Sequence, residues 1–365
     1  MSKAYAASGV NYDYLDPIKR LAQKMGKETA LNLKNLPYKE LSQSRGESAY
    51  IIEDKDRYYA QVIEGLGTKN LVADAMRKVT GRSYYDAIAC DTVATVINDL
   101  ITVGARPLTV MAYWAAGSSN WWKDEERAKD LSRGWKKACD DASCTWGGGE
   151  TPSMIDVVNP DTINLAGSGF GIIKPKNRIV TGTDIKEGDC ILFLGSNGIH
   201  ANGLSLARKI TQKLKNGYKE KLSNGTLFGE SLLKPTYIYS RLIQDALDSG
   251  IKIHYMINIT GHGWRKIMRY PGSFTYVINE VPRISPLFSF IKEKANLSDR
   301  QMYETFNMGA GFALILDEKY AAKIFTLSRK YGIRSWVGGR VEKGPKKVVI
   351  KPLNIIYEQN ELNIR

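Results

Sequence analysis

Residues 83–104 constrain the fold more than any other segment, because they predict a helix that is apolar on most of its sides. The polar side chains of this segment include Asp91, Thr95, Asn98 and Asp99. At about 100° per residue, positions 91, 95 and 98 share one face and Asp99 flanks it. The other positions carry apolar side chains at a helical period: Ile88, Val93, Val96, Ile97, Leu100 and Ile101. We therefore expect a largely buried helix with one polar stripe.

The polar stripe has two interpretations. Polar residues along one side of a helix often form its solvated face. However, a buried carboxylate needs a cation or several hydrogen-bond donors, and short oxygen ligands on one stripe suit magnesium. The stripe thus indicates a metal site, with the solvated face as the alternative.

The segment Glu64-Gly-Leu-Gly-Thr-Lys69 precedes this helix and combines groups that bind phosphate. Gly65 and Gly67 allow backbone N–H groups to approach an anion closely, and clustered N–H groups form a nest for phosphate oxygens. Lys69 adds a point charge, and the Glu64 carboxylate can hold the accompanying magnesium. The segment lacks the P-loop pattern. A charged surface turn is the alternative interpretation.

A third segment, Trp146-Gly-Gly-Gly-Glu-Thr151, places three glycines before a carboxylate and a hydroxyl. A plain tight turn needs only one or two glycines. We therefore predict that the backbone of this segment approaches a ligand closely.

In the second half of the chain, residues 195–203 and 260–264 form glycine-rich turns after predicted strands. Turns of this kind bind anions at the N-terminus of a following helix. Of the three histidines in the chain, His200 and His262 lie in these turns, whereas His254 lies in a strand pattern. No serine-nucleophile motif and no zinc-like His/Cys cluster accompanies them.

Composition limits the class of protein. The 365 residues are 43% hydrophobic, which suits one large or two ordinary globular domains. The formal charge of +14 suits either nucleic acid or the nucleotide and sugar-phosphate substrates of an enzyme. No nucleic-acid module is recognisable, which disfavours nucleic acid as the main partner. No membrane-spanning stretch or signal peptide is evident, and the four cysteines are scattered, so we expect a cytoplasmic protein with reduced thiols.

A polar, proline-containing joint at residues 174–178 divides the chain into domains 1–173 and 174–365. The pattern predicts the α+β class, with two mixed α/β domains. We expect further helices at Leu15–Met25, Trp121–Cys139, from Gly203, Thr236–Gly250, Pro286–Ala295 and Glu318–Tyr331, and strands at Ile163–Ile173, Cys190–Gly195, Ile251–Ile259, Phe274–Val281 and Phe312–Leu316.

Taken together and in this order, these segments resemble the aminoimidazole ribonucleotide synthetase family, also called phosphoribosylformylglycinamidine cyclo-ligase. The similarity runs from about Gly9 to Val349. It is carried by residues 64–69, Asp91 through Gly104, Gly148-Gly-Glu-Thr151, Ala166-Gly167, His200-Ala-Asn-Gly-Leu-Ser-Leu206, Leu233-Lys-Pro-Thr236, Ile259-Thr-Gly261 and Thr305-Phe-Asn-Met-Gly309.

The resemblance implies a homodimer whose N-terminal domains build a shared β-barrel, with ATP bound near the interface. It also implies the reaction, a step of de novo purine biosynthesis. The γ-phosphate of ATP activates the amide oxygen of formylglycinamidine ribonucleotide, and an internal amine then closes the imidazole ring. Domain 1–173 would bind ATP and dimerise, and domain 174–365 would form the substrate side.

The resemblance also assigns roles to individual residues. It implies magnesium ligands at Glu64, Asp91, Asp99 and Glu150, with Lys69 and His200 as catalytic candidates. His262, which the family pattern lacks, is a further catalytic candidate because it could replace the histidine missing at Asn258. It places substrate contacts at Asn202, Ser205, Thr260 and Gly261. It places ATP contacts at Glu64, Gly65, Gly67, Thr68, Lys69, Asn98, Gly148, Gly149 and Thr151.

The chain departs from the family pattern at several of these positions. Glu64 stands where aspartate is usual, and Asn258 stands where a histidine usually precedes Ile-Thr-Gly. His262 interrupts a triple-glycine turn. Two alternatives therefore stay open. One is another ATP-using member of the superfamily, such as a thiamin-phosphate kinase or a selenophosphate synthetase. The selenophosphate synthetase is disfavoured because it needs a reactive cysteine or selenocysteine near its N-terminus, whereas the first cysteine here is Cys90. The other is a non-enzymatic paralogue.

Overall fold

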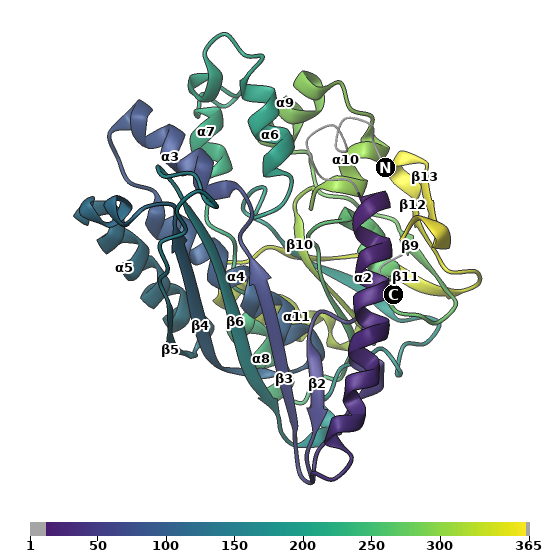
Figure 1. Cartoon of the computed structure of the whole chain (residues 1–365). Coiled ribbons are helices and arrows are strands. Elements are labelled where there is room, and N and C mark those ends of the chain that lie inside the picture. Colours follow the sequence, from purple (N-terminus) through teal and green to yellow (C-terminus); the bar gives the residue numbers. More distant parts are fainter. Residues whose placement is uncertain (1–11, 363–365) are drawn as a thin grey trace.

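The computed structural model describes residues 12–362, which form two β-sheets with helices packed around them (Figure 1). Residues 9–11, with which the family resemblance begins, lie outside this range. Each sheet is built from one continuous half of the chain, with strands from residues 39–173 in the first and 190–358 in the second. The prediction of mixed α/β halves is confirmed.

The first sheet has six strands in the order β1-β2-β3-β6-β4-β5. Neighbouring strands are antiparallel except β4 and β5, which are parallel. The strands are β1 (Lys39–Glu40), β2 (Tyr50–Glu53), β3 (Tyr58–Gly65), β4 (Arg106–Ala116), β5 (Thr145–Glu150) and β6 (Ile163–Ile173). The sheet is open, with β1 and β5 at its edges, so a barrel shared between two chains stays a prediction.

Within residues 12–173 the structure shows the α-helices α2 (Tyr12–Glu28), α3 (Lys69–Thr80), α4 (Tyr85–Leu100) and α5 (Glu125–Ala142). Helix α4 is the buried helix predicted from residues 83–104, and it lies behind the sheet in the view of Figure 1. Glycines in β6 allow its close approach. A Cβ atom at Gly169 would lie 2.6 Å from Val96 Cγ1 of α4. The glycines of residues 163–173 therefore do accommodate a neighbouring element, as their spacing predicts.

The second sheet has seven strands in the order β13-β12-β9-β11-β7-β10-β8. All neighbours are antiparallel except β12 and β9. The strands are β7 (Cys190–Gly195), β8 (Ile253–Asn258), β9 (Phe274–Ile278), β10 (Ala310–Leu316), β11 (Ser335–Lys343), β12 (Lys347–Ile350) and β13 (Ile355–Glu358). The helices of this half are α6 (Leu204–Thr211), α7 (Phe228–Leu232), α8 (Ser240–Asp248), α9 (Pro286–Ala295), α10 (Asp299–Thr305) and α11 (Ala321–Lys330).

The helix predicted from Thr236 begins four residues later, at Ser240. Backbone groups of residues 236–239 are used elsewhere. The Thr236 N–H donates to Asp91 Oδ1 at 2.8 Å, and the Tyr239 N–H donates to Asn98 Oδ1 at 3.0 Å. The polar stripe of α4 therefore keeps these backbone groups out of helical hydrogen bonds, and the helix begins only at Ser240.

The triple-glycine segment is not a turn. It forms the edge strand β5, parallel to β4. A Cβ atom at Gly149 would lie 2.1 Å from the Ala112 carbonyl oxygen, and one at Gly147 would lie 2.8 Å from Met111 Sδ. Close approach of the neighbouring strand therefore accounts for two of these glycines.

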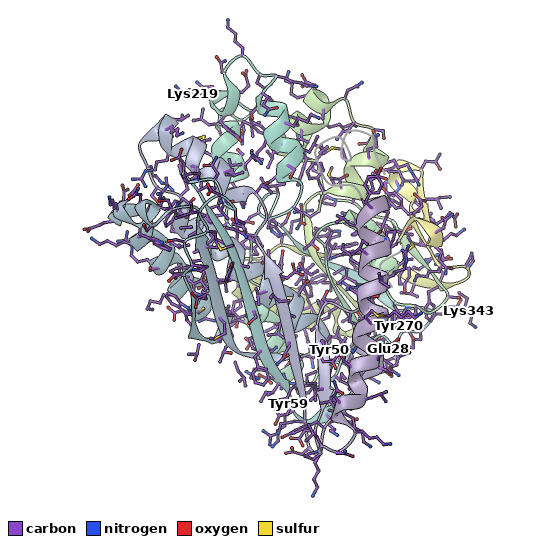
Figure 2. All side chains as sticks on the ribbon, viewed as in Figure 1. Glu28, Tyr50, Tyr59, Lys219, Tyr270 and Lys343 are labelled. Atoms are coloured by element: carbon purple, nitrogen blue, oxygen red, sulfur yellow. The ribbon has the colours of Figure 1, made fainter. Side chains whose placement is uncertain are left out.

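The face of the first sheet that points away from α4 is uncovered in the described chain and carries apolar side chains. Ile63 of β3 is 79% exposed and Met111 of β4 is 42% exposed. Ser168 of β6 pairs with both of them, so the three positions form one row across the sheet. Further along this sheet Tyr59, labelled in Figure 2, stacks on Phe170 with ring centroids 5.7 Å apart. An exposed apolar sheet face of this kind marks a surface for association.

Across residues 12–362, none of the helices has both the length and the apolar character needed to cross a bilayer.

Candidate active site

A cleft of about 340 Å³ lies where the two halves of the chain meet. Its first wall is the segment from Glu64 to Thr68, at the junction of β3 and α3, together with Thr95 and Asp99 of α4. The opposite wall comes from the second half of the chain: Ala201, Asn202, Gly203, Leu204, Ser205, Asn258, Thr260 and Lys266. An adjoining pocket of about 350 Å³ shares Glu64, Asp99, Asn202, Thr260 and Lys266 and adds Gly261 and His262.

The cleft brings together many of the residues that the sequence singled out. Glu64, Gly65, Gly67, Thr68 and Asp99 line it from the first half. From the second half, the cleft and its adjoining pocket are lined by Asn202, Ser205, Thr260, Gly261 and His262. Two glycine-containing segments far apart in sequence thus face each other across one cavity.

Two carboxylates, Glu64 and Asp99, interact directly inside the cleft. Burial, followed by the charge of Asp99, raises the pKa of Glu64 to about 7, whereas Lys266 acts in the opposite direction. Asp99 accepts a hydrogen bond of 2.7 Å from Asn258 Nδ2, at the end of β8. The asparagine that replaces the family's usual histidine therefore contacts a predicted magnesium ligand directly.

Lys266 is the residue of the cleft that the sequence interpretation missed. It lies in the 3-10 helix Gly263–Met268 and is only 8% exposed. Its Nζ donates to Thr260 Oγ1 and, at 3.4 Å, to the carbonyl oxygen of Asn258. Burial lowers the pKa of Lys266 to about 8, and Asp99 opposes this shift. Its place six residues after Thr260, in a glycine-rich turn, was the available signal.

The Glu64–Asp99 pair fits a magnesium ion. Magnesium binds one or two carboxylates and keeps its other positions for water and phosphate oxygens. Within the part of the chain that the structure describes, no group of three or more His, Cys, Asp or Glu side chains could hold a metal. The structure thus brings two of the four predicted magnesium ligands together and places Asp91 and Glu150 elsewhere.

Lys69 and Asp91 form a buried ion pair outside the cleft lining. Their Nζ–Oδ2 distance is 2.7 Å, and both side chains are 0% exposed. Lys69 Nζ also donates to the carbonyl oxygens of His200 at 3.0 Å and Lys234 at 2.9 Å. An ammonium group has three donors, so this arrangement leaves none for a phosphate. Asp91 in turn accepts from the backbone and hydroxyl of Thr236.

His200 and Asn98 lie outside the lining of the cleft, whereas His262 lines the adjoining pocket. His200 is 3% exposed, and burial, with Lys69 second, lowers its pKa to about 3. The Asn98 amide donates to the Tyr237 carbonyl oxygen at 2.8 Å and accepts from the Tyr239 backbone. His262 adjoins the cleft with a left-handed φ of 69°, and burial, then Lys266, lowers its pKa to about 3.

The segment Gly148–Thr151 lies away from the cleft. β4 and β6 separate β5 from β3, which carries Glu64. Gly148, Gly149, Glu150 and Thr151 are exposed to solvent. Within one chain, therefore, they do not contribute to the cleft.

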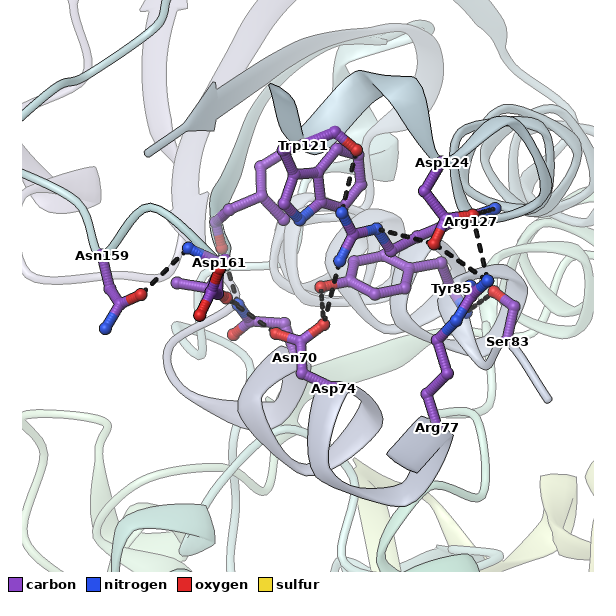
Figure 3. A network of polar contacts seen from close by, with 12 residues as sticks. Asn70, Asp74, Arg77, Ser83, Tyr85, Trp121, Asp124, Arg127, Asn159 and Asp161 are labelled. Carbon is purple, nitrogen blue, oxygen red and sulfur yellow. Dashed lines mark hydrogen bonds and ion pairs between the residues drawn. The ribbon is translucent and has the colours of Figure 1, made fainter. Parts of the chain in front are cut away.

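A separate, larger pocket of about 790 Å³ lies beside α3 and contains none of the predicted site residues (Figure 3). Many of its polar groups contact one another, although Arg77 Nη1, Trp121 Nε1 and Arg127 Nε are buried without a hydrogen-bond partner. Asp74 accepts from Tyr85 and from Thr162, both at 2.8 Å. Arg127 lies 4.0 Å over the Trp121 ring, which it contacts through a cation–π interaction. This internal pairing indicates a structural network, so we assign the chemistry to the cleft.

Comparison with known proteins identifies relatives of both halves. The model of the AIR synthase related protein, N-terminal domain, matches residues 46–173, and that of the C-terminal domain matches residues 186–351. A phosphoribosylformylglycinamidine cyclo-ligase of Methanocaldococcus jannaschii is 37% identical over 80% of both chains. The enzyme of the same name from Carboxydothermus hydrogenoformans is 35% identical over 95% of this chain and 98% of its own.

Solved structures share the fold at lower identity. A chain of the HypE–HypF complex superposes with a TM-score of 0.61 at 17% identity, covering 86% of this chain and 92% of that one. AaThiL complexed with AMPPCP and TMP gives 0.59 at 15% identity, covering 91% and 96%. These similarities establish the fold alone.

The buried ion pair generates a first prediction. Lys69→Met keeps the length of the side chain but leaves the Asp91 carboxylate buried without its cation. We expect it to lower the free energy of unfolding by about 3–5 kcal/mol, measured by urea denaturation. The exposed pair Lys129–Glu125 provides the control, because Lys129→Met should cost less than about 1 kcal/mol. Equal stability of Lys69→Met and wild type would contradict this account.

The raised pKa of Glu64 generates a second prediction. Between pH 4.5 and about 7 the folded Glu64 retains a proton that the unfolded one has lost. The metal-free protein therefore loses stability as pH rises through this window, and above it the full penalty is present. Glu64→Gln removes the penalty, so at pH 8 its melting temperature should exceed that of wild type by about 2–5 °C.

The exposed Glu28→Gln variant is the control for this measurement. It should show the same pH dependence of melting temperature as wild type. An unchanged pH profile in Glu64→Gln would show that Glu64 titrates normally in the folded protein.

Proposed function

The chain belongs to the AIR synthase related family, and we propose that it uses the interdomain cleft to perform the cyclo-ligase reaction of its relatives. The reaction is the ATP-dependent closure of formylglycinamidine ribonucleotide to aminoimidazole ribonucleotide, a step of de novo purine biosynthesis. The observation that carries the proposal is the convergence of Glu64, Asp99, Asn202 and Thr260 on one cavity.

The chemistry replaces a poor leaving group with a good one. The γ-phosphoryl group of ATP passes to the amide oxygen, so its bond to the oxygen of ADP breaks as the new P–O bond forms. The internal amine then adds to the amide carbon that bears the phosphorylated oxygen. Phosphate leaves with the electron pair of the C–O bond, and the proton of the amine passes to water. Such a reaction depends mainly on positioning and on stabilisation of phosphoryl charge.

The first wall of the cleft suits the triphosphate. Gly67 has a φ of 79°, and nothing lies within 4 Å of the position of its absent Cβ, so the backbone is open to a ligand at this point. The glycine segment leads directly into α3, whose N-terminal N–H groups favour an anion. Glu64 and Asp99 would hold Mg²⁺, which neutralises phosphate charge when bound.

The second wall suits the other substrate. Asn202 and Ser205 flank the start of α6, and Thr260 follows β8. Their amide and hydroxyl groups can donate to and accept from the ribonucleotide. His262 adjoins them as a neutral imidazole, since burial holds its pKa well below the ordinary value. It is therefore suited to take part in hydrogen bonds as a neutral ring rather than to take up a proton or supply positive charge.

A homodimer is part of the proposal. The uncovered row of Ile63 and Met111 gives one sheet an apolar face that a second copy would bury. Gly148, Gly149, Glu150 and Thr151 are exposed on an edge strand of the same sheet, so their predicted ATP contacts require a neighbouring chain. A cytoplasmic location completes the proposal, in keeping with four free cysteines.

The reaction has a direct test. Purified protein supplied with formylglycinamidine ribonucleotide, ATP and Mg²⁺ should form ADP and aminoimidazole ribonucleotide in equal amounts. Asp99→Asn should reduce this turnover by at least about 100-fold while the protein stays folded, because charge stabilisation dominates phosphoryl transfer. The exposed Asp86, on the same helix, is the control and Asp86→Asn should keep wild-type rates. ADP release without the imidazole product would refute the assignment.

The dimer has its own test. Ile63→Arg places a charge on the uncovered sheet face, so it should raise the dimer dissociation constant by at least about 100-fold in sedimentation experiments. Ile356→Arg, on the second sheet, is the matched control since Ile356 is 42% exposed. If Ile63→Arg sediments like wild type, this face does not form the interface.

A further inference from the structure

The sequence assigns the phosphate-binding lysine of this site to Lys69, but the structure gives that residue no opening to a ligand. Its side chain is 0% exposed and its three donors contact Asp91, His200 and Lys234. A phosphoryl group is nevertheless the charge that the cleft must bind. Either this charge meets only magnesium and backbone N–H groups, or another cation of the chain contacts it.

Lys266 is the lysine that lines both the cleft and its adjoining pocket. The pocket is also lined by Lys19 and Arg269, but Arg269 donates to the carbonyl oxygen of Gly46 and to Ser48. Lys19 belongs to α2, which lies outside the cleft lining itself. The position of Lys266 therefore differs from that of the other cations near the site.

The contacts of Lys266 hold its ammonium group in the cleft that Glu64 and Asp99 also line. Thr260 Oγ1 accepts one hydrogen bond from it, and the Asn258 carbonyl oxygen accepts a long one of 3.4 Å. The Asn258 amide group in turn donates to Asp99. An ammonium group has three donors, and these two hydrogen bonds use two of them, which leaves one for a ligand oxygen.

The charges of the cleft are arranged on two sides. Glu64 and Asp99, the proposed magnesium ligands, come from the first half of the chain, and Lys266 comes from the second. A phosphoryl group between them would contact a carboxylate-bound cation on one side and an ammonium group on the other. This is the arrangement that phosphoryl transfer requires, because charge develops on the oxygens of the transferred group.

We propose that Lys266 contacts the γ-phosphoryl group of ATP as it passes to the substrate, and that Lys69 does not. The proposal rests on the proposed function for the identity of the acceptor, but the contact with ATP is independent of it. Lys266 donates hydrogen bonds to phosphoryl oxygens and keeps its proton throughout. Lys69 acts instead as a positioning residue, because it fixes the segment that begins α3.

The decisive experiment compares two ligands that differ in the γ-phosphate. Lys266→Met should weaken binding of a non-hydrolysable ATP analogue with Mg²⁺ by at least about tenfold and leave the affinity for ADP with Mg²⁺ within about twofold. Isothermal titration calorimetry measures both. The exposed Lys129→Met is the matched control and should leave both affinities within about twofold of wild type. Lys69→Met, measured at a temperature where it stays folded, should show no loss that is selective for the γ-phosphate. Equal losses for the two ligands in Lys266→Met, or a selective loss in Lys69→Met, would overturn the proposal.

Turnover gives a second and separate readout. Lys266→Met should lose at least about 100-fold in kcat, and Lys266→Arg, which keeps the charge, should recover part of it. Lys266→Gln replaces Lys266→Met in both assays if the methionine variant does not fold. If the wild-type protein forms no imidazole product, the cyclo-ligase reaction is refuted. If Lys266→Met still weakens binding of the ATP analogue and not of ADP, the contact between Lys266 and the γ-phosphate is supported all the same. Wild-type kcat in a folded Lys266→Met variant would refute the role of Lys266.

Discussion

The buried ion pair between Lys69 and Asp91 is the interaction on which the rest of the structure depends. Removing two charges from water is costly, and their mutual attraction offsets the cost only when further hydrogen bonds satisfy both groups. Here the backbone of the second half supplies them, through the carbonyl oxygens of His200 and Lys234 and the N–H group of Thr236. The pair therefore joins α3 and α4 to two loops of the second half, one after β7 and one before α8. This junction fixes the positions of the two walls of the cleft.

The cleft buries charged groups whose ionised forms are destabilised by loss of water and by a neighbouring like charge. Two carboxylates share a partly dehydrated space, which raises the pKa of Glu64, and a buried lysine faces them with its pKa lowered. A stability-optimised protein would replace these groups with apolar ones. Their retention is the usual sign of a binding site, where strain in the empty state is relieved when the ligand arrives.

Much of this architecture could be predicted from the sequence, and the failures have physical causes. The apolar periodicity of residues 85–100 identified α4, and alternation identified β6. Residues 64–68 line the cleft, and their binding to ATP stays a prediction. Propensity cannot show which direction a lysine points, so the sequence assigned Lys69 to phosphate, whereas its side chain lies in a buried ion pair. The stripe of α4 was recognised as buried and polar, yet Asp91 and Asn98 found their partners in residues 236–239, more than a hundred positions away. Lys266 was missed although it follows the glycine-rich turn at Thr260, because its approach to Glu64 depends on how the two halves of the chain pack.

The polar stripe of α4 also has a consequence for synthesis of the chain. Asp91 and Asn98 are buried side chains whose hydrogen-bond partners include Thr236, Tyr237 and Tyr239. On the ribosome, the first sheet and its central helix are complete long before those partners emerge. Until then α4 carries unsatisfied polar groups inside an otherwise apolar layer. We therefore expect the N-terminal half to stay incompletely packed until residues 236–239 have been synthesised. The two halves would then complete their packing together rather than one after the other.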